Sequence, residues 1–273
     1  MTRKDTKIVE AGRAPSLHAG AVNTPVYRVS TVLFPDVETM RNESQPYTYG
    51  RRGTPTTRTL EDAICDLEGG ARTVLTPSGL SACTLAILAT CGAGDHLLVT
   101  DSVYGPTRVF CQRVAKRYGI STTYFDPNIG AGIDELFQPN TKAVFLESPG
   151  SYTFEVQDVP AIAAAAHRRD IAVILDNTWA TPLYFNAIAH GVDLSVQAAT
   201  KYIGGHADIM NSYANGEIVI MNRDGSGYRV LPIPRNRIVG PTLSPSGEKL
   251  AYLVASSDKP RSRGMHKIGR AHV

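Results

Sequence analysis

The stretch IAVILDNTWATP (residues 171–182) is followed closely by SVQAATKYIGGHAD (residues 195–208), and these two stretches say most about the fold. In the first, an uninterrupted apolar run ends at Asp176. In the second, a shorter apolar run ends a few residues before Lys201. Short apolar runs of this kind are typical of strands that are buried in a parallel sheet. They predict two successive strands, each followed by one ionisable side chain.

The same alternation extends toward the start of the chain. A helix is predicted in TPTTRTLEDAICDLEGG (residues 54–70), which ends at a pair of glycines. Strands alternating with helices predict an α/β fold with a mostly parallel sheet covered by helices on both faces. Ligands of such sheets bind outside the carboxyl ends of the strands. The predicted strands lie near residues 73–76, 97–100, 121–125, 142–146, 171–175 and 193–197, and the helices between them near 79–91, 105–118, 158–168 and 182–190.

Composition narrows the class of protein. A chain of 273 residues can form one large or two modest domains. It has no apolar run long enough to span a membrane, and its polar start, MTRKDTKIVE, lacks a secretory signal, so we expect a cytoplasmic protein. The four cysteines have neither metal-ligand nor disulfide spacing, so we expect no metal site and reduced thiols.

Lys201 and Asp176 together indicate a specific chemistry. A lysine amine can form an imine with a carbonyl group, and a carboxylate can keep a pyridine nitrogen protonated. Pyridoxal phosphate enzymes require both groups. Taken singly, Lys201 could be an ordinary surface lysine, and Asp176 could be the cap of the following helix.

Six motifs in sequence order strengthen this interpretation. From about residue 7 to about residue 211 the chain resembles the cystathionine β-lyases, within the Cys/Met-metabolism family of fold-type I pyridoxal phosphate enzymes. The resemblance implies a fold-type I transferase-like α/β fold, an N-terminal arm (residues 1–50), a cofactor-binding large domain (residues 51–211) and a homo-oligomer, with a dimer of dimers for the intact enzyme. The motifs are YTYGRRGTPT (47–56), TPSGLSA (76–82), DSVYGPT (101–107), LESPGS (146–151), ILDNTWATP (174–182) and QAATKYIGGHAD (197–208).

The resemblance also implies roles for residues around the cofactor ring. Lys201 would attach the cofactor and then remove the proton from the substrate Cα, and Asp176 would pair with the pyridine nitrogen. Tyr104 would stack on the ring and assist proton transfer. Trp179 and His206 lie in matching motifs, and we expect structural roles for both.

Other residues are expected to bind the phosphate. Ser78, Gly79 and Leu80 open a predicted helix, whose first N–H groups suit an anion, and Thr200 could add a hydroxyl. Many relatives have a serine three residues before the lysine, where this chain has Ala198. The resemblance implies that two further residues, Tyr49 and Arg51, reach across a dimer interface to the phosphate of the neighbouring subunit.

The implied reaction is the β-elimination of L-cystathionine to homocysteine, pyruvate and ammonia in methionine biosynthesis. Ser151 favours it, because β-lyases tend to have Gly-Ser after E-S-P where enzymes acting at the γ-carbon commonly have asparagine. A cystathionine γ-lyase or γ-synthase is the first alternative. A non-enzymatic, propeller-associated binding protein is the second. The basic tail lacks interleaved aromatic residues, so we expect no nucleic-acid partner.

The last part of the chain has a different composition. Residues 1–212 carry a net charge of −3 and residues 213–273 a net charge of +6. Residues 212–258 resemble a single TolB-type propeller repeat, with EIVIMN and KLAYLVAS as strands and RDGSG and SPSGEK as turns. Residues 259–273, ending in KIGRAHV, resemble translated sequencing adapter, or else form a disordered tail. We therefore expect a large domain cut off before its C-terminal domain, with little lyase activity.

Overall fold

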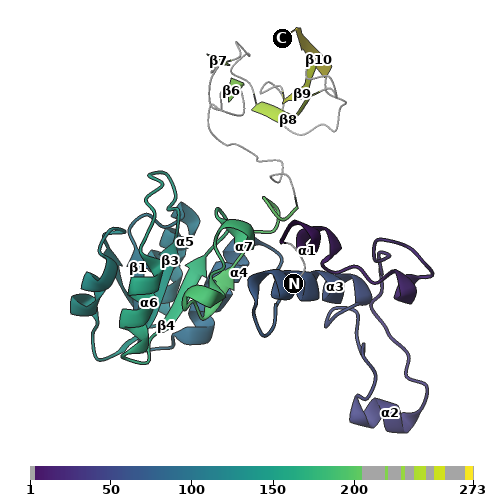
Figure 1. Cartoon of the computed structure of the whole chain (residues 1–273), viewed down its shortest axis with the longest axis horizontal. Coiled ribbons are helices and arrows are strands. Elements are labelled where there is room, and N and C mark those ends of the chain that lie inside the picture. Colours follow the sequence, from purple (N-terminus) through teal and green to yellow (C-terminus); the bar gives the residue numbers. More distant parts are fainter. Residues whose placement is uncertain are drawn as a thin grey trace. The chain divides into compact units, whose positions relative to one another are not determined.

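The structure, a computed structural model, describes residues 4–204 and, after them, the backbone of five short strands between residues 219 and 272 (Figure 1). The chain divides into two compact units, Met1–Gly205 and His206–Val273. The first unit contains a five-stranded sheet made of β1 (His96–Thr100), β2 (Ser121–Phe125), β3 (Thr141–Glu147), β4 (Ala172–Asp176) and β5 (Leu194–Val196).

The helices described in the first unit lie between these strands and before them. The α-helices are α1 (Lys4–Glu10), α2 (Val37–Asn42), α3 (Pro55–Glu68), α4 (Gly79–Thr90), α5 (Gly105–Val109), α6 (Val159–His167) and α7 (Thr181–Tyr184). Short 3₁₀ helices are η1 (Pro15–His18), η3 (Gly130–Leu136) and η4 (Ile188–His190), and η2 (Phe110–Ala115) is a π-helical turn that continues α5.

The five strands pair in parallel in the order β2-β1-β3-β4-β5, so the predicted parallel α/β sheet is confirmed. The chain moves from β1 outward to β2, then crosses back to β3 and continues outward on the other side of β1. The order therefore reverses between β1 and β3. In open α/β sheets, the crevice outside the carboxyl ends at such a reversal is the usual ligand site.

Helices cover both faces of this sheet, as predicted. Successive side chains of a strand point to opposite faces, which gives two separate buried clusters. On one face Phe145 and Ile174 pack with Cys83 and Ile87 of α4. On the other, the alternate strand residues Val144, Leu146, Val173 and Leu175 pack with α6. Glu147 and Asp176 lie two residues after Phe145 and Ile174, so they continue the rows that face α4.

Two of the predicted elements differ from the structure. Residues 73–76, predicted as a strand, pair with no strand of the described sheets, and Val74 is 62% exposed. The helix predicted over 182–190 is split into α7 and η4. Phe185 between them is extended (φ −140°), and its carbonyl accepts a hydrogen bond from Asn177 Nδ2 instead.

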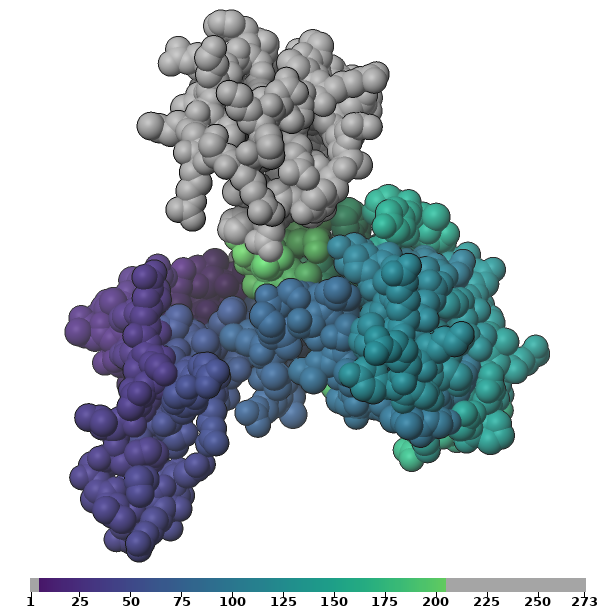
Figure 2. Space-filling model, turned by 180° about the vertical axis from the view of Figure 1, so that it is seen from behind, coloured from purple at the N-terminus to yellow at the C-terminus, as the bar shows by residue number. Residues whose placement is uncertain are grey.

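The first fifty residues were predicted to form an arm, and that division of the chain stays a prediction. They contain α1, η1 and α2, and most of their side chains are exposed. Figures 1 and 2 show α2 away from the strands of the sheet. The arm contacts α3 by polar bonds such as Lys7 to Asp66 at 3.0 Å and the Tyr27 N–H to Thr56 Oγ1 at 2.8 Å.

The second unit is described only by its strands. These are β6 (Val219–Ile220), β7 (Arg229–Val230), β8 (Arg237–Leu243), β9 (Lys249–Ala255) and β10 (Ile268–His272). β6 pairs with β7, and β9 lies between β8 and β10, all antiparallel. The predicted propeller turns fall outside the described residues, so the domain boundaries after residue 211 stay predictions. Within the described part of the chain, no helix is long and apolar enough to cross a membrane.

Candidate active site

The carboxyl edge of the sheet gathers the ionisable residues that the sequence predicted, together with one that it did not. Asp176 is the last residue of β4, and Glu147 is the last residue of β3. The two are direct register partners, so their side chains lie on the same face. Tyr104 follows β1, and Lys201 follows β5. Four neighbouring strands, β1, β3, β4 and β5, therefore bring these residues to one edge.

The Asp176 carboxylate is oriented by two groups. Its Oδ1 accepts a hydrogen bond of 3.1 Å from the Thr178 N–H, and its Oδ2 lies 3.6 Å from the Cys83 thiol of α4. Burial, and then the negative charge of Asp176, raise the pKa of Cys83 well above its ordinary range. The thiol therefore stays protonated and donates a hydrogen bond to Asp176 Oδ2. Such an arrangement holds a carboxylate in one orientation at the end of the strand.

Glu147 was missed by the sequence analysis. Its Oε2 accepts a hydrogen bond of 2.7 Å from the Tyr104 N–H, and its Oε1 accepts one of 2.6 Å from the Ser151 hydroxyl. Burial and the charge of Asp176 raise the pKa of Glu147 to about 7, while these donors and the charge of Lys201 act in the opposite direction. The sequence did contain a signal for Glu147, because its carboxylate directly follows a predicted buried strand. In the motif LESPGS, however, only Ser151 was interpreted as a functional residue.

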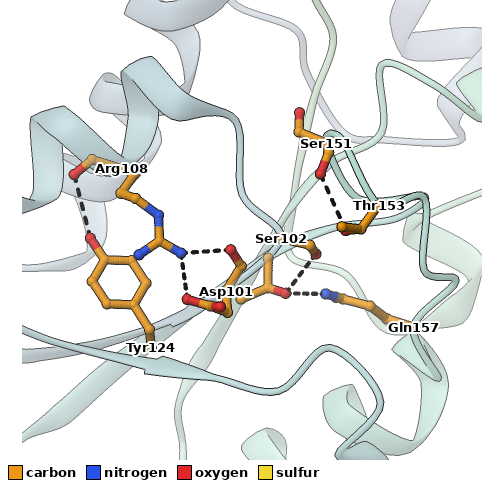
Figure 3. Close-up of polar contacts among 8 residues, drawn as sticks. Asp101, Ser102, Arg108, Tyr124, Ser151, Thr153 and Gln157 are labelled. Carbon is orange, nitrogen blue, oxygen red and sulfur yellow. Dashed lines mark hydrogen bonds and ion pairs between the residues drawn. The ribbon is translucent and has the colours of Figure 1, made fainter.

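A hydrogen-bond network connects the loop after β1 to the loop after β3 (Figure 3). Gln157 donates to Thr100 Oγ1, which also bonds to Ser102 at 3.1 Å. The Ser151 N–H donates to the Ser102 carbonyl at 2.8 Å. Gly150 fits here because a Cβ would lie 2.3 Å from Ser102 Oγ. The two loops that flank the reversal in strand order are thus in close contact.

Lys201 lies in a loop that is fastened to the loop after β4. The Ala198 N–H donates to Thr178 Oγ1 at 2.8 Å, and Gln197 Nε2 donates to the Asn177 carbonyl at 3.2 Å. The Lys201 side chain is exposed, and its N–H donates to the Ala198 carbonyl at 3.0 Å. The lysine loop and the Asp176 loop are therefore held together, as the sequence predicted for one site.

The predicted phosphate-binding residues also come together, and here the fit to a cofactor can be tested. Ser78 caps α4 by accepting a hydrogen bond of 3.1 Å from the Ser81 N–H. A Cβ on Gly79 would lie 2.7 Å from the Cβ of Ala198, so a side chain would close the space between α4 and the lysine loop. Ser78, Gly79 and Thr200 line one side of a cavity of about 550 Å³ between α3, α4 and β5, whose lining does not include Asp176 or Lys201. The fit to a phosphate therefore rests on the start of α4 itself, because the first N–H groups of a helix suit an anion.

The remaining predicted residues are placed as follows. Leu80 follows Gly79 in α4 and is 38% exposed. Arg51 Nε donates to the Tyr49 hydroxyl at 2.9 Å, and the predicted role of these two residues in a neighbouring subunit stays a prediction. Trp179 is half exposed and contacts the rings of Phe154 and Tyr202, with centroids 5.4 and 5.7 Å away.

His206 lies outside the described residues. Within the part of the chain that the structure describes, no group of three or more His, Cys, Asp or Glu side chains could hold a metal ion. The ionisable residues gathered at the carboxyl edge of the sheet include one lysine, Lys201, and two carboxylates, Asp176 and Glu147.

The sequence of this chain is similar to those of known cystathionine β-lyases. A protein of Rhizobium johnstonii, provisionally named cystathionine β-lyase, is 54% identical over 206 residues, covering 76% of this chain and 52% of its own length. Cystathionine β-lyase of Escherichia coli K12 is 47% identical over 213 residues, covering 76% and 54%. The chain thus spans about half the length of the curated relatives it matches.

A solved structure has the same fold. Cystathionine γ-lyase of Lactobacillus plantarum, complexed with L-serine, superposes with a TM-score of 0.71 at 31% identity, covering 77% of this chain and 53% of that one. The model of the family described as "Cys/Met metabolism PLP-dependent enzyme" matches residues 5–252, past residue 211 where we expected the resemblance to end. The chain therefore belongs to the Cys/Met-metabolism family of pyridoxal phosphate-dependent enzymes.

Proposed function

We propose that this chain provides the cofactor-binding part of a carbon–sulfur lyase that performs β-elimination on L-cystathionine in the cytoplasm, for methionine biosynthesis. The products would be homocysteine, pyruvate and ammonia. The observation that carries the proposal is the joining of Lys201, Asp176 and the start of α4 at one edge of the sheet. Identities of 54% and 47% to β-lyases support the choice of reaction.

Pyridoxal phosphate, when bound, supplies a pyridinium ring that stabilises negative charge at the substrate Cα. Asp176, held by Thr178 and Cys83, would keep the proton on the ring nitrogen. The first N–H groups of α4, at Gly79 and Leu80, would bind the phosphate with the Thr200 hydroxyl. Tyr104 would pack against the ring, and the Lys201 amine would attach the cofactor and then move the proton at Cα.

A second reaction class is γ-elimination or γ-replacement. The structural match to a cystathionine γ-lyase favours it. The two reactions use the same cofactor residues and differ at the carbon from which the sulfur leaves. They also give different keto acids, because β-elimination of cystathionine yields pyruvate whereas γ-elimination yields 2-oxobutyrate. Assaying both products from L-cystathionine separates the two.

Residues of a neighbouring subunit would complete the site. Under this proposal Tyr49 and Arg51, which bond to each other shortly before α3, reach the phosphate of a second copy. The enzyme would then be a homo-oligomer, and its size in solution is measured by light scattering. A monomer that binds the cofactor with full affinity would contradict this part of the proposal.

Covalent trapping tests the cofactor part directly. The chain is incubated with pyridoxal phosphate, reduced with borohydride and digested, and the peptides are analysed by mass spectrometry. We expect one major pyridoxyl adduct, on Lys201, and its loss in K201A. Lys142→Ala is the matched control, because Lys142 is an exposed lysine at the amino end of β3. Labelling spread evenly over surface lysines would refute the proposed role of Lys201.

A further inference from the structure

Glu147 lies where the strand order reverses, between β1 and β3, yet the proposed chemistry assigns it no task. Its carboxylate connects three segments: the end of β3, the start of α5 at Tyr104, and the loop at Ser151. Each of its two oxygens accepts one hydrogen bond, Oε2 from the Tyr104 segment and Oε1 from the Ser151 segment. A half-buried acid with both oxygens bonded in this way holds the segments at fixed separations.

The start of α5 has no side-chain cap, although one turn later Arg108 bonds to Asp101. Tyr104 is the residue before α5, its φ and ψ are −49° and 130°, and its own side chain does not cap the helix. The Tyr104 side chain is 40% exposed, so packing restrains it only in part. The bond from its N–H to Glu147 therefore supplies much of the restraint on the direction in which Tyr104 leaves the backbone.

The neighbouring contacts leave Glu147 little freedom to move. Ser151, which donates to Oε1, is itself held by its N–H bond to the Ser102 carbonyl. Gly150 packs so closely on Ser102 that a Cβ would lie 2.5 Å from the Ser102 Cβ. The loop after β3 is thereby fixed against the loop after β1, with the carboxylate between them.

We propose that Glu147 is a positioning residue, whose two hydrogen bonds hold Tyr104 in the orientation in which its ring contacts the cofactor. This inference rests on the proposed function, because it assumes that the cofactor binds at the carboxyl edge of the sheet. It adds a residue that acts through Tyr104. Glu147 acts as a hydrogen-bond acceptor, so a glutamine, which keeps one acceptor oxygen and the same shape, retains most of its effect.

Cofactor affinity tests this directly. Trp179 is the only tryptophan of the chain and lies three residues after Asp176, so quenching of its emission by added pyridoxal phosphate reports binding without any assay of turnover. We expect Glu147→Leu to weaken binding by roughly 10- to 100-fold, the usual effect of leaving buried hydrogen-bond donors without their acceptor. Glu147→Gln should stay within about 3-fold of the unsubstituted chain.

A double-mutant cycle separates positioning from a merely structural role. In a Tyr104→Ala background the ring is absent, so E147L should cost almost nothing further in affinity. The same 10-fold or larger cost in both backgrounds would overturn the proposal, as would E147L binding with full affinity. Glu155→Leu is the matched control, because Glu155 lies in the same loop and bonds to Thr153, outside the contacts of Tyr104.

Two further results keep the test decisive. If E147L does not fold, Ser151→Ala replaces it in the cycle, because it removes the hydroxyl that orients Glu147, and the expected loss is then about 3-fold. If the unsubstituted chain neither quenches nor gives a trapped adduct on Lys201, the proposed function fails. Trapping on Lys201 with no effect of E147L leaves that function intact and refutes only the role of Glu147.

Discussion

The two edges of the parallel sheet both carry buried polar side chains, but they satisfy them in different ways. At the amino edge, His96 is 1% exposed, and its ring nitrogens bond to the hydroxyls of Thr141 at 2.8 Å and Thr123 at 2.9 Å. Burial lowers the pKa of His96, which favours the neutral form of the ring. At the carboxyl edge, Glu147 and Asp176 stand side by side as two acids, with the Lys201 charge near enough to lower the pKa of Glu147.

The difference shows which buried polar groups indicate function. A neutral group whose hydrogen-bond partners are also neutral contributes to stability, but it offers no charge that could bind a charged ligand. Two acids one strand apart repel each other, and such a pair costs stability unless a cation joins them. The amino edge is thus a structural connection, whereas the carboxyl edge is where we propose that a positively charged ring binds. Substitutions at the two edges should therefore affect different properties.

Asp176→Asn should have the largest effect. It keeps the shape of the side chain but removes the charge that would pair with a protonated ring nitrogen. We expect the affinity for pyridoxal phosphate, measured by Trp179 quenching, to fall roughly 150- to 5000-fold, since breaking a buried charge pair costs roughly 3–5 kcal/mol. Thermal unfolding of the cofactor-free protein should be unchanged or slightly raised. If Asp176→Asn lowered the thermal stability but bound pyridoxal phosphate with full affinity, Asp176 would not be the partner of the ring nitrogen.

His96→Ala should show the opposite pattern. It leaves the Thr141 and Thr123 hydroxyls without their partner and opens a cavity, so we expect the free energy of unfolding to fall by about 3 kcal/mol in urea titrations. The affinity for pyridoxal phosphate should stay the same. His167→Ala is the control, because His167 forms an exposed ion pair with Asp193 and should cost less than about 1 kcal/mol.

The acidic pair predicts a pH dependence of stability. Since the pKa of Glu147 rises from its ordinary 4.5 to about 7 on folding, the native state holds a proton that the unfolded state has lost between these values. The contribution of Glu147 is therefore most favourable below pH 4.5, falls as the pH rises to 7, and is constant above. Relative to Glu147→Gln, the cofactor-free chain should lose up to about 3 kcal/mol over this range.

Urea titrations of both proteins at pH 5, 6 and 7 check this expectation. The quantity to follow is the difference between their free energies of unfolding, because contributions from other titrating groups cancel. A difference that stays constant from pH 5 to 7 would mean that Glu147 is fully ionised throughout. In that case the neighbouring acid and burial would not raise the pKa of Glu147, and the carboxyl edge would lack the acid pair that distinguishes it from the amino edge.

Gly79→Ala should have the smallest effect of the four. The added Cβ would meet the Cβ of Ala198 at 2.7 Å, and overpacking of this kind costs about 1–3 kcal/mol unless the lysine loop moves. We expect about a 10-fold loss of affinity for pyridoxal phosphate, measured by the same quenching. Gly70→Ala is the matched control, because a Cβ there meets nothing within 4 Å and should leave the affinity unchanged.

Much of the fold could be predicted from local patterns. The apolar runs that correspond to β1 to β5 are short and lie between helical segments, and this alternation was enough to predict the strands. The segment 73–76 has the same apolar character, but a strand also needs a neighbour to bond with, and a local pattern cannot tell whether one is present. For the same reason the helix predicted over 182–190 missed the break at Phe185, which depends on a bond from Asn177.

By itself, the sequence determined the class of fold, the positions of Asp176 and Lys201 after their strands, and the resemblance that led to the cofactor. These depend on spacing along the chain, and the apolar runs and motifs carry that information. Only the tertiary structure decided that Glu147 bonds to Tyr104 and that Gly79 adjoins Ala198. The reason is that strand order and loop packing join residues more than forty positions apart, and no local pattern encodes such contacts.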